Sequence, residues 1–373
     1  MREVIIMATV AVPLCLMLAS GAEGQQEPEV WVHPDCERLP IDRIGPIVEL
    51  GDGRLMMVQG NASITSEDDG ASWSQPQPIY QGEPPGVPST GQLIRTSDGV
   101  LILVYMDAST KQWRWNDEKG GPDVAELDVW SIRSTDDGRT WTDRQKLLDG
   151  WCGAVMDIIE TTDGEVVVPV QDLLLHPARH AQYTYTTSDN GQSWVRSNVI
   201  DIGGHGHHDG GCEGTLTELS DGRLYMLLRT NLDRFWEALS DDHRYWRELR
   251  PSPITASSSP GGLQRLASGR IALVYNRLYP EGTVNQDEYP RQAGQYSEVM
   301  ASWHREELSI RFSEDDCRTW SDPVVIMRKQ GAWVSYPRVF ERRPGELWIT
   351  CSQLKPITWV RLMEDDFVAR ERQ

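Results

Sequence analysis

Five residues whose types suit binding and chemistry on an acidic ligand lie at matching distances from turn glycines. Arg43, Glu213 and Tyr336 precede such glycines by 10, 9 and 9 residues. Arg229 follows one by 7 residues, and Arg305 lies in a long connection after another. Guanidinium groups bind carboxylates through paired hydrogen bonds, so converging arginines would form a carboxylate receptor. Convergence depends on the elements that carry these residues.

The turn glycines belong to a hairpin that is repeated along the chain. In each copy an apolar run ends at a glycine-containing turn, and a second apolar run follows, as at 224–228. Such patterns predict β-hairpins. The six turn glycines are Gly53, Gly99, Gly164, Gly222, Gly269 and Gly345.

A second repeated element is an aspartate turn with the pattern Ser/Thr-x-Asp-x-Gly-x-x-Trp. It occurs at 66–73, 134–141 and 187–194, and at 313–320 with Cys317 in place of glycine; a shortened copy covers 240–246. The aspartate is expected to accept backbone N–H bonds, the glycine to adopt a left-handed conformation and the tryptophan to pack between strands. We therefore assign these turns to structure rather than chemistry.

Hairpins and aspartate turns alternate, which gives units of four strands. The turn glycines are 46 to 76 residues apart. Four-stranded units at this period are typical of propellers, whose blades pack radially. We predict an all-β fold, a six-bladed β-propeller of four-stranded antiparallel blades, as one domain over residues 23–373. The segment 29–32 is a candidate closing strand, and a seventh blade or an open array is the alternative.

The repeated unit places residues on one rim of the propeller. If the hairpin lies at the bottom, the first strand begins at the top and the second returns there. The connection between the second and third strands is then also at the top. The rim should gather side chains from several blades, namely Arg43, Asp107, Asp123, Glu213, Arg229, Asn276, Arg305 and Tyr336. The top of a propeller channel is a concave polar site, which suits ligand binding.

Two further segments are expected at this rim. The glycine-rich stretch 204–211 carries His207 and His208 and leads directly into Glu213. We expect these histidines to contact substrate or to assist as acid or base, and metal binding or simple solvation are the alternatives. The insertion 279–302, with Asp287, Glu288 and Arg291, is expected to cap the site.

Composition limits the partners and the compartment. The net charge of −20 argues against nucleic acid or an anionic membrane as a partner. Residues 1–22 have the pattern of a signal peptide, with an uncleaved anchor as the alternative. Five cysteines remain after cleavage, an odd number without metal-site spacing. We predict a secreted or periplasmic monomer that needs no metal or cofactor.

Four segments of the chain resemble the sialidase superfamily with aspartate-box (BNR) repeats. The segment Cys-Glu-Gly-Thr-Leu at 212–216, followed by Arg229, is similar to the family's glutamate and second-arginine segment. The segment that begins at Arg305 resembles the family's third-arginine segment, and Ser335-Tyr336-Pro337 resembles its tyrosine segment. Arg43-Ile-Gly-Pro is a weaker match to the family's first-arginine segment. The resemblance covers nearly all of the chain after the signal peptide.

This resemblance implies an exo-acting hydrolase for a terminal sialic acid or related acidic sugar, with retention of configuration. Tyr336 would be the nucleophile, because a neutral tyrosine is not repelled by the sugar carboxylate. Glu213 would take its proton as general base. The family's acid/base aspartate has no counterpart in the first unit, so Asp123 takes that role and Asp107 is the reserve. Arg43, Arg229 and Arg305 would bind the carboxylate.

Two other functions remain open on the sequence. A hydrolase or lyase for a uronate-containing polysaccharide would keep the carboxylate receptor and use tyrosine and histidine as base and acid. A non-catalytic propeller would bind an acidic glycan without turnover. Product analysis on sialylated and uronate-containing glycans separates all three.

Overall fold

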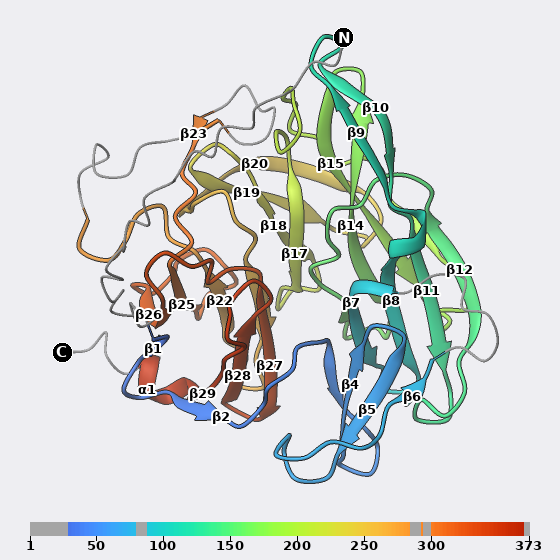
Figure 1. Ribbon diagram of the computed structural model, residues 1–373, viewed down its shortest axis with the longest axis vertical. Coiled ribbons are helices and arrows are strands. Elements are labelled where there is room, and N and C mark those ends of the chain that lie inside the picture. The colour runs from blue at the N-terminus through green and yellow to red at the C-terminus, as the bar shows by residue number, and fades with distance from the viewer. Residues whose placement is uncertain (1–28, 80–87, 284–291, 294–299, 369–373) are drawn as a thin grey trace, which may run out of the picture.

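The computed structural model describes residues 29–79, 88–283, 292–293 and 300–368. Six antiparallel sheets surround a central channel, and each contributes one blade (Figure 1). The fold is therefore the predicted all-β six-bladed propeller. The expected signal peptide at 1–22 and the expected cap residues Asp287, Glu288 and Arg291 lie outside the described residues.

The strands of each blade follow one another from the channel outward. Blade one consists of β3 (Ile47–Glu49), β4 (Leu55–Gln59), β5 (Ala62–Ser66) and β6 (Gln77–Pro78). Blade two consists of β7 (Pro88–Arg95), β8 (Leu101–Asp107), β11 (Val129–Ser134) and β12 (Thr142–Leu148). Blade three consists of β13 (Ile159–Glu160), β14 (Val166–Leu175), β15 (Ala178–Thr187) and β16 (Val195–Arg196). Blade four consists of β17 (Cys212–Glu218), β18 (Leu224–Arg229), β19 (Arg234–Ser240) and β20 (Trp246–Thr255). Blade five includes β21 (Gly262–Arg265), β22 (Ile271–Tyr275), β25 (Glu307–Ser313) and β26 (Val324–Arg328). Blade six includes β27 (Pro337–Arg343), β28 (Glu346–Cys351) and β29 (Trp359–Met363).

Two strands from the N-terminal part of the chain complete blades five and six. The candidate closing segment forms β1 (Trp31–Val32), which adds a fifth strand to blade five by pairing with β26. The strand that closes the ring is instead β2 (Glu37–Leu39), which pairs with β29 as the outermost strand of blade six. The first and last parts of the domain therefore share a sheet.

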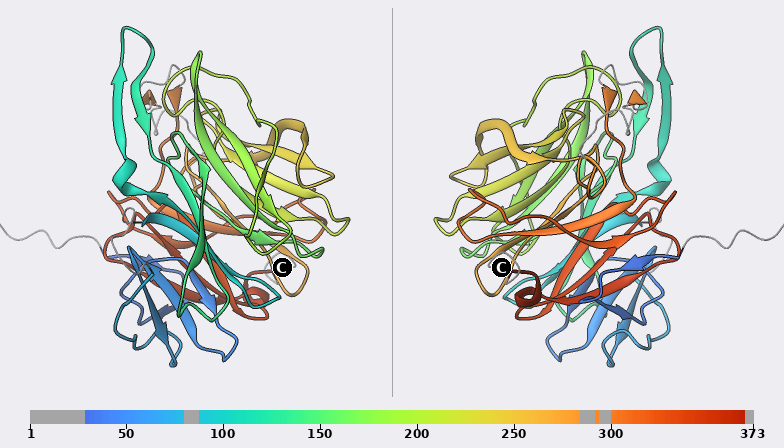
Figure 2. Two further views of the ribbon diagram at one scale, coloured as in Figure 1. Left: turned by 90° about the vertical axis from the view of Figure 1, so that its right-hand side faces the viewer. Right: turned by 90° about the vertical axis from the view of Figure 1, so that its left-hand side faces the viewer.

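Smaller elements decorate this framework. A hairpin of β9 (Gln112–Asn116) and β10 (Gly121–Glu126) stands away from blade two (Figure 2), and β23 (Gln292–Ala293) pairs with β24 (Met300–Ala301). The helical pieces are a short 3-10 helix at Ala108–Thr110 and α1 (Glu364–Val368). Within the described residues no helix is long and apolar enough to span a membrane.

The two repeated turns have the geometry that their sequences predict. All six hairpin glycines have φ between 77° and 90°, which favours glycine. In the first aspartate turn Asp68 accepts from Ser66, from the backbone N–H of Ser72 and from the Ser72 hydroxyl, and Trp73 donates to the carbonyl of Gly70. Cys317 adopts the left-handed conformation, φ 63°, in place of glycine in the fourth turn.

Apolar central strands explain why the blades pack face to face. Every residue of β8, β18 and β22 is buried, so these strands contact neighbouring blades on both faces. Glutamates tie neighbouring blades at the bottom of the channel: Glu160 accepts from the Ser97 backbone and Glu218 from that of Thr162. The rim above is thus held by a rigid frame.

Candidate active site

Tyr336 and Glu213 meet at the top of the channel, at the start of the innermost strands of blades six and four. The Tyr336 hydroxyl donates to Oε1 of Glu213 at 2.6 Å. Nη1 of Arg229 donates to Oε2 of Glu213 at 2.7 Å and lies 3.3 Å from the Tyr336 oxygen. The glutamate is therefore placed to take the tyrosine proton, with an arginine that neutralises its charge.

Arg305 completes a pair of buried guanidinium groups beside this dyad. It donates to the carbonyl of Ser258 at 2.5 Å, while Nε of Arg229 donates to the Ser258 hydroxyl at 3.1 Å. The rings of Trp303, Trp333 and Tyr336 lie 4.9, 4.7 and 5.6 Å from the Arg305 guanidinium carbon.

Two N–H groups of these arginines have no hydrogen-bond partner among the described residues. They are Nη2 of Arg229 and Nε of Arg305, and both are buried. Buried polar groups are nearly always paired, so a pair left open beside a reactive dyad indicates a site for a ligand. Two adjacent guanidinium donors suit the two oxygens of a carboxylate.

The backbone holds the reactive side chains in sparsely populated conformations. Glu213, Tyr336 and His208 have φ of 44°, 63° and 71°, all in the left-handed region although none is glycine. Such strain clusters at functional sites when the surroundings fix it. Asn276 fixes the approach to Tyr336, because its amide donates to the carbonyl of Val334 at 2.8 Å and to that of Glu307 at 2.6 Å.

Burial and neighbouring charges shift the pKa values of the site residues in different directions. Burial raises the pKa of Tyr336 well above its ordinary value, and the Glu213 carboxylate raises it further. Burial alone would lower the pKa of Arg229, but Glu213 outweighs this effect and raises it. For Arg305 the balance is reversed: burial, followed by repulsion from Arg229, outweighs Tyr336 and Glu213 and lowers its pKa to about 10.

A chain of hydrogen bonds runs from Glu213 to the histidine loop. The backbone N–H of Glu213 donates to Oε1 of Gln171 at 3.0 Å, which leaves the Gln171 amide nitrogen 2.9 Å from Nδ1 of His180. Nε2 of His180 lies 3.1 Å from Nδ1 of His207. Since the amide nitrogen can only donate, Nδ1 of His180 accepts, its Nε2 carries the hydrogen, and His207 accepts at Nδ1. This relay assigns one neutral tautomer to each ring.

The pKa values of the histidines agree with neutral rings. Burial lowers the pKa of His180 to about 3 and that of His207 to about 4. Burial and the nearby Arg229 lower the pKa of His208 further still. None of these imidazoles therefore carries a positive charge at neutral pH.

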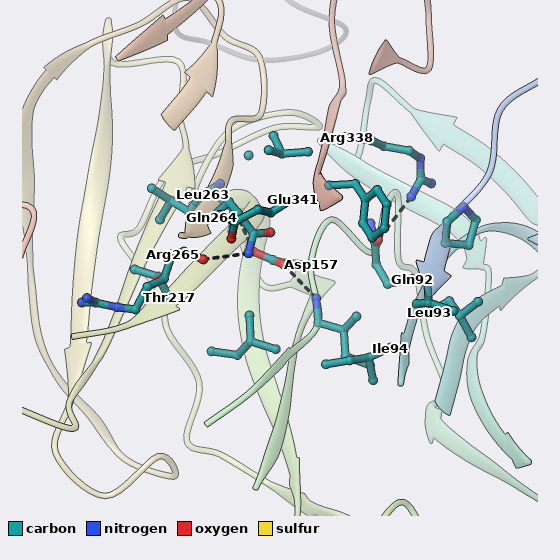
Figure 3. A pocket seen from close by; sticks show the side chains of 18 of the residues that line it. Gln92, Leu93, Ile94, Asp157, Thr217, Leu263, Gln264, Arg265, Arg338 and Glu341 are labelled. Atoms are coloured by element: carbon teal, nitrogen blue, oxygen red, sulfur yellow. Dashed lines mark hydrogen bonds between the residues drawn. The ribbon is translucent and has the colours of Figure 1, made fainter. Parts of the chain in front are cut away.

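A cavity of about 670 Å³ fills the channel below the dyad (Figure 3). Its upper wall joins one blade to the next: Gln92 donates to the carbonyl of Val155 at 3.0 Å, and Thr215 donates to Asp157 at 2.7 Å. Arg338 reaches from blade six to blade two, where it donates to Gln92 at 3.2 Å. Burial raises the pKa of Asp157 to about 6 and lowers that of Arg338 to about 10.

The repeated units and the propeller fold are shared with known proteins. Residues 63–349 match the model of the BNR repeat-like domain. The chain belongs to the BNR repeat-like family. No curated protein sequence matches it.

Solved structures with the same propeller come from several groups of proteins. A protein of unknown function from Dyadobacter fermentans is 14% identical, with a TM-score of 0.60 over 89% of this chain and 100% of that one. NanB sialidase from Streptococcus pneumoniae is 12% identical, with a TM-score of 0.54 over 91% of this chain and 71% of that one. The GH93 α-L-arabinofuranosidase of Fusarium graminearum is 13% identical, with a TM-score of 0.55 over 86% and 92%. These likenesses establish the sialidase-type fold of this family member.

The structure gathers most of the residues that the sequence placed on the rim. Glu213, Arg229, Arg305 and Tyr336 form the cluster described above. His207 and His208 stack on each other beside it, with ring centroids 4.0 Å apart. Asn276 positions the loop before Tyr336 rather than facing a ligand, because both its amide N–H groups bond to backbone carbonyls.

Three predicted rim residues lie in other surroundings. Arg43 pairs with Asp42 at 3.0 Å and faces the ring of Trp73 at 6.0 Å. Asp107 is buried and accepts from Arg144 at 3.0 Å.

Asp123 is the third, and it lies on the β9–β10 hairpin. It accepts from Arg114 and Asn116, each at 3.2 Å, and lies 3.6 Å from the Lys119 nitrogen. The Asn116 hydrogen bond is the largest effect on its pKa, which is lowered from the ordinary value. These contacts suit hairpin structure and an ionised carboxylate.

Sequence reasoning missed several residues of the site. Gln171 and His180 lie in strands whose apolar neighbours indicate only a buried sheet, and Ser258 lies in a serine run without a motif. A polar residue in an otherwise apolar strand is the signal that could have found Gln171.

The structure also shows how the candidate metal-binding side chains and the cysteines are arranged. In the described ranges no group of three or more His, Cys, Asp or Glu side chains is arranged to hold a metal ion. All five cysteines after residue 28 are free thiols, and four of them are buried.

Proposed function

We propose that this protein is an exo-acting, sialidase-like glycoside hydrolase that removes a terminal sialic acid or related acidic sugar with retention of configuration. The observation that carries the proposal is the 2.6 Å contact between Tyr336 and Glu213 beside two arginines with open, buried N–H groups. The shared fold with sialidases supports it. The signal-peptide pattern is our reason to propose that it acts outside the cytoplasm.

The residues of the dyad suit the first half of a retaining reaction. The substrate carboxylate would bind Nη2 of Arg229 and Nε of Arg305, which directs the anomeric carbon toward Tyr336. The tyrosine is protonated at rest, so Glu213 takes its proton as the oxygen attacks. A bond forms between that oxygen and the anomeric carbon while the glycosidic bond breaks. A neutral nucleophile avoids repulsion by the substrate carboxylate.

The second half of the reaction needs a base that activates water. Asp123 is our candidate, because its hydrogen bonds and neighbouring cations keep it ionised. Asp123 pairs with Arg114 and Asn116 on the polar face of the projecting hairpin, so in this role it would have to leave these partners and turn toward the dyad. An ionised Asp123 does not protonate the leaving group, which would depart as an alkoxide or aryloxide and take its proton from water, so substrates with good leaving groups should react fastest. In the second half water attacks the anomeric carbon as Asp123 takes its proton, the bond to the Tyr336 oxygen breaks, and Glu213 returns its proton to that oxygen.

Tyr336→Phe tests the assignment. It removes one hydroxyl and keeps the pair between Arg229 and Glu213, so the fold and ligand binding should survive. Hydrolysis of an aryl sialoside should fall by at least about 10³-fold, as for loss of other enzymatic nucleophiles. Calorimetric binding of sialic acid provides the control. Turnover that survives in Tyr336→Phe would remove the tyrosine from the mechanism, and wild-type binding without any product would indicate a binding propeller.

One observation favours a second reaction on the same receptor. The buried Nδ1 of His208 has no hydrogen-bond partner in the part of the chain that the structure describes, and a substrate carboxylate that neutralised Arg229 would remove one cause of its lowered pKa. On a uronate, the arginines would neutralise the carboxylate, His208 would take the C5 proton, and protonated Tyr336 would donate to the leaving O4 as the C4–O4 bond breaks. The product would be an unsaturated uronate with a new ultraviolet absorbance. Its appearance with oligouronates, and its absence with sialosides, would decide for elimination.

A further inference from the structure

The channel cavity below the dyad is lined by a cation, Arg338, whose charge is matched only by neutral groups. Arg338 lies two residues after Tyr336, and its guanidinium group reaches across to blade two (Figure 3). It donates to Oε1 of Gln92 at 3.2 Å and to the carbonyl of Gly91 at 3.1 Å. Its Nε is buried and has no hydrogen-bond partner among the described residues. Burial lowers the pKa of Arg338, and no described carboxylate is close enough to oppose this effect.

The other charged side chains that line the cavity have charged or hydrogen-bonded partners. Arg265, for example, lies 2.7 Å from a carboxylate oxygen of Asp316. Asp157 accepts from the Thr215 hydroxyl at 2.7 Å, and its carboxylate also accepts from a backbone N–H. Among the described residues of this wall, Arg338 is the exception.

A buried guanidinium group without a counter-charge is costly. Charges that leave water are stabilised by an opposite charge or by a full set of hydrogen bonds, and loss of either destabilises the fold. An anion beside Nε of Arg338 would supply both the missing acceptor and the missing negative charge. The cavity of about 670 Å³ has room for such an ion together with water.

The wall favours an anion that is small and carries one charge. The nearest amide donor, that of Gln92, is already used, because it donates to the carbonyl of Val155 at 3.0 Å. Phosphate and carboxylate groups bind best to several donors at once, whereas a spherical ion can bind to one guanidinium group. The carboxylates of Glu160 and Glu218 lie on the same wall and would repel a second negative charge.

We propose that the channel below the dyad binds a small monovalent anion, of the size and charge of chloride, against the guanidinium group of Arg338. This site is separate from the carboxylate receptor, whose open donors belong to Arg229 and Arg305. The anion would stabilise the ring, because Arg338 joins blade six to blade two. It would bind whether or not the protein cleaves a glycosidic bond.

Thermal unfolding in sodium chloride and in sodium gluconate, at equal ionic strength, tests the site. Gluconate is too large and needs too many donors to replace chloride. Chloride should raise the melting temperature of the wild type by about 2 °C, as a ligand of the folded state does. In Arg338→Met the cation is gone, so the shift should vanish, whatever the variant's own melting temperature. Equal shifts in the two proteins would overturn the proposal.

Two further variants locate the anion. Arg265→Met is the matched control, since it removes a channel arginine that already has a carboxylate partner, and it should keep the chloride shift. Arg305→Met tests the carboxylate receptor and should keep the shift as well. A shift that is lost in Arg305→Met and kept in Arg338→Met would place the anion in the receptor and refute the channel site.

Wild-type crystals grown in sodium bromide give a direct measurement that needs no variant. Bromide scatters anomalously, so its position can be identified. A bromide peak beside Nε of Arg338 is the expected result. Bromide found only beside Arg229 and Arg305, or no bromide in the channel, would contradict the proposal.

Discussion

Arg305→Lys is a substitution that keeps a positive charge and changes how strongly that charge depends on pH. The Arg305 pKa is lowered to about 10, chiefly by burial and then by Arg229. The same surroundings would lower a lysine pKa from about 10.4 to about 8. The lysine would be charged below that pH and neutral above it, so carboxylate binding should be lost as the pH rises through about 8.

The measurement is the calorimetric Kd of sialic acid from about pH 6 to about pH 10. At the acidic end, loss of the forked guanidinium should weaken binding about tenfold. Above about pH 8 the Kd should rise further, by up to tenfold per pH unit, while wild-type binding should hold until near pH 10. Arg139→Lys, on an exposed aspartate turn, is the control. A Kd for Arg305→Lys that stays flat between about pH 7 and about pH 9 would refute a buried carboxylate contact at this position.

Three further perturbations follow from the relay, its loop and the hairpin. Gly210→Ala should reduce the free energy of unfolding by more than about 2 kcal/mol in urea, because the new Cβ would lie 2.2 Å from the His180 carbonyl. Gly164→Ala, with a similar φ of 80° and nothing within 4 Å, should cost only about 1 kcal/mol, and equal costs would contradict the clash. Lowering the pH from about 6.5 to about 4 should destabilise the protein by about 1.4 kcal/mol per pH unit for each of His180 and His207, since only their unfolded forms take up protons there. Urea midpoints that stay constant over this range would argue against two buried neutral rings. Asp123→Asn should lower kcat about 10²-fold and produce a burst of leaving group, and an unchanged steady state would reassign the base.

The fold was predictable because its repeats are local. Each hairpin glycine and each aspartate turn is decided by a few neighbouring residues, so counting them gave six blades without any long-range information. The closing strand was less accessible. Both 29–32 and 37–39 are short, and only packing against blades five and six decides which of them completes the ring.

Counting from the turn glycines brings some of the rim side chains together and leaves others apart. Glu213 and Tyr336 precede their glycines by 9 residues and meet, whereas Arg43 precedes its glycine by 10 and faces Trp73. Arg229 follows its glycine by 7 residues and enters the site, whereas Asp107 follows by 8 and pairs with a neighbouring cation. Asp107 and Arg229 both end a strand, and side chains alternate along a strand, so their offset of one residue turns the two side chains to opposite faces. Arg43 lies before β3, where the count from the glycine does not fix the direction of a side chain.

The relay could not have been predicted in the same way. Gln171 and His180 come from β14 and β15 of blade three, while Glu213 belongs to blade four. The hydrogen bond between Glu213 and Gln171 crosses between these blades and depends on how two sheets pack. A count within one repeat carries no such information.

The pairing of β2 with β29 also fixes when activity can arise as the chain folds. Blade six joins residues 37–39 to a strand at 359–363, so it cannot form until almost the whole domain has been synthesised. Tyr336 directly precedes the first strand of that blade, and Glu213 lies in blade four. Contacts between such distant parts of a chain form late and slowly. A partly made or partly folded molecule would therefore hold its arginines and its glutamate but not its tyrosine, and would bind before it can react.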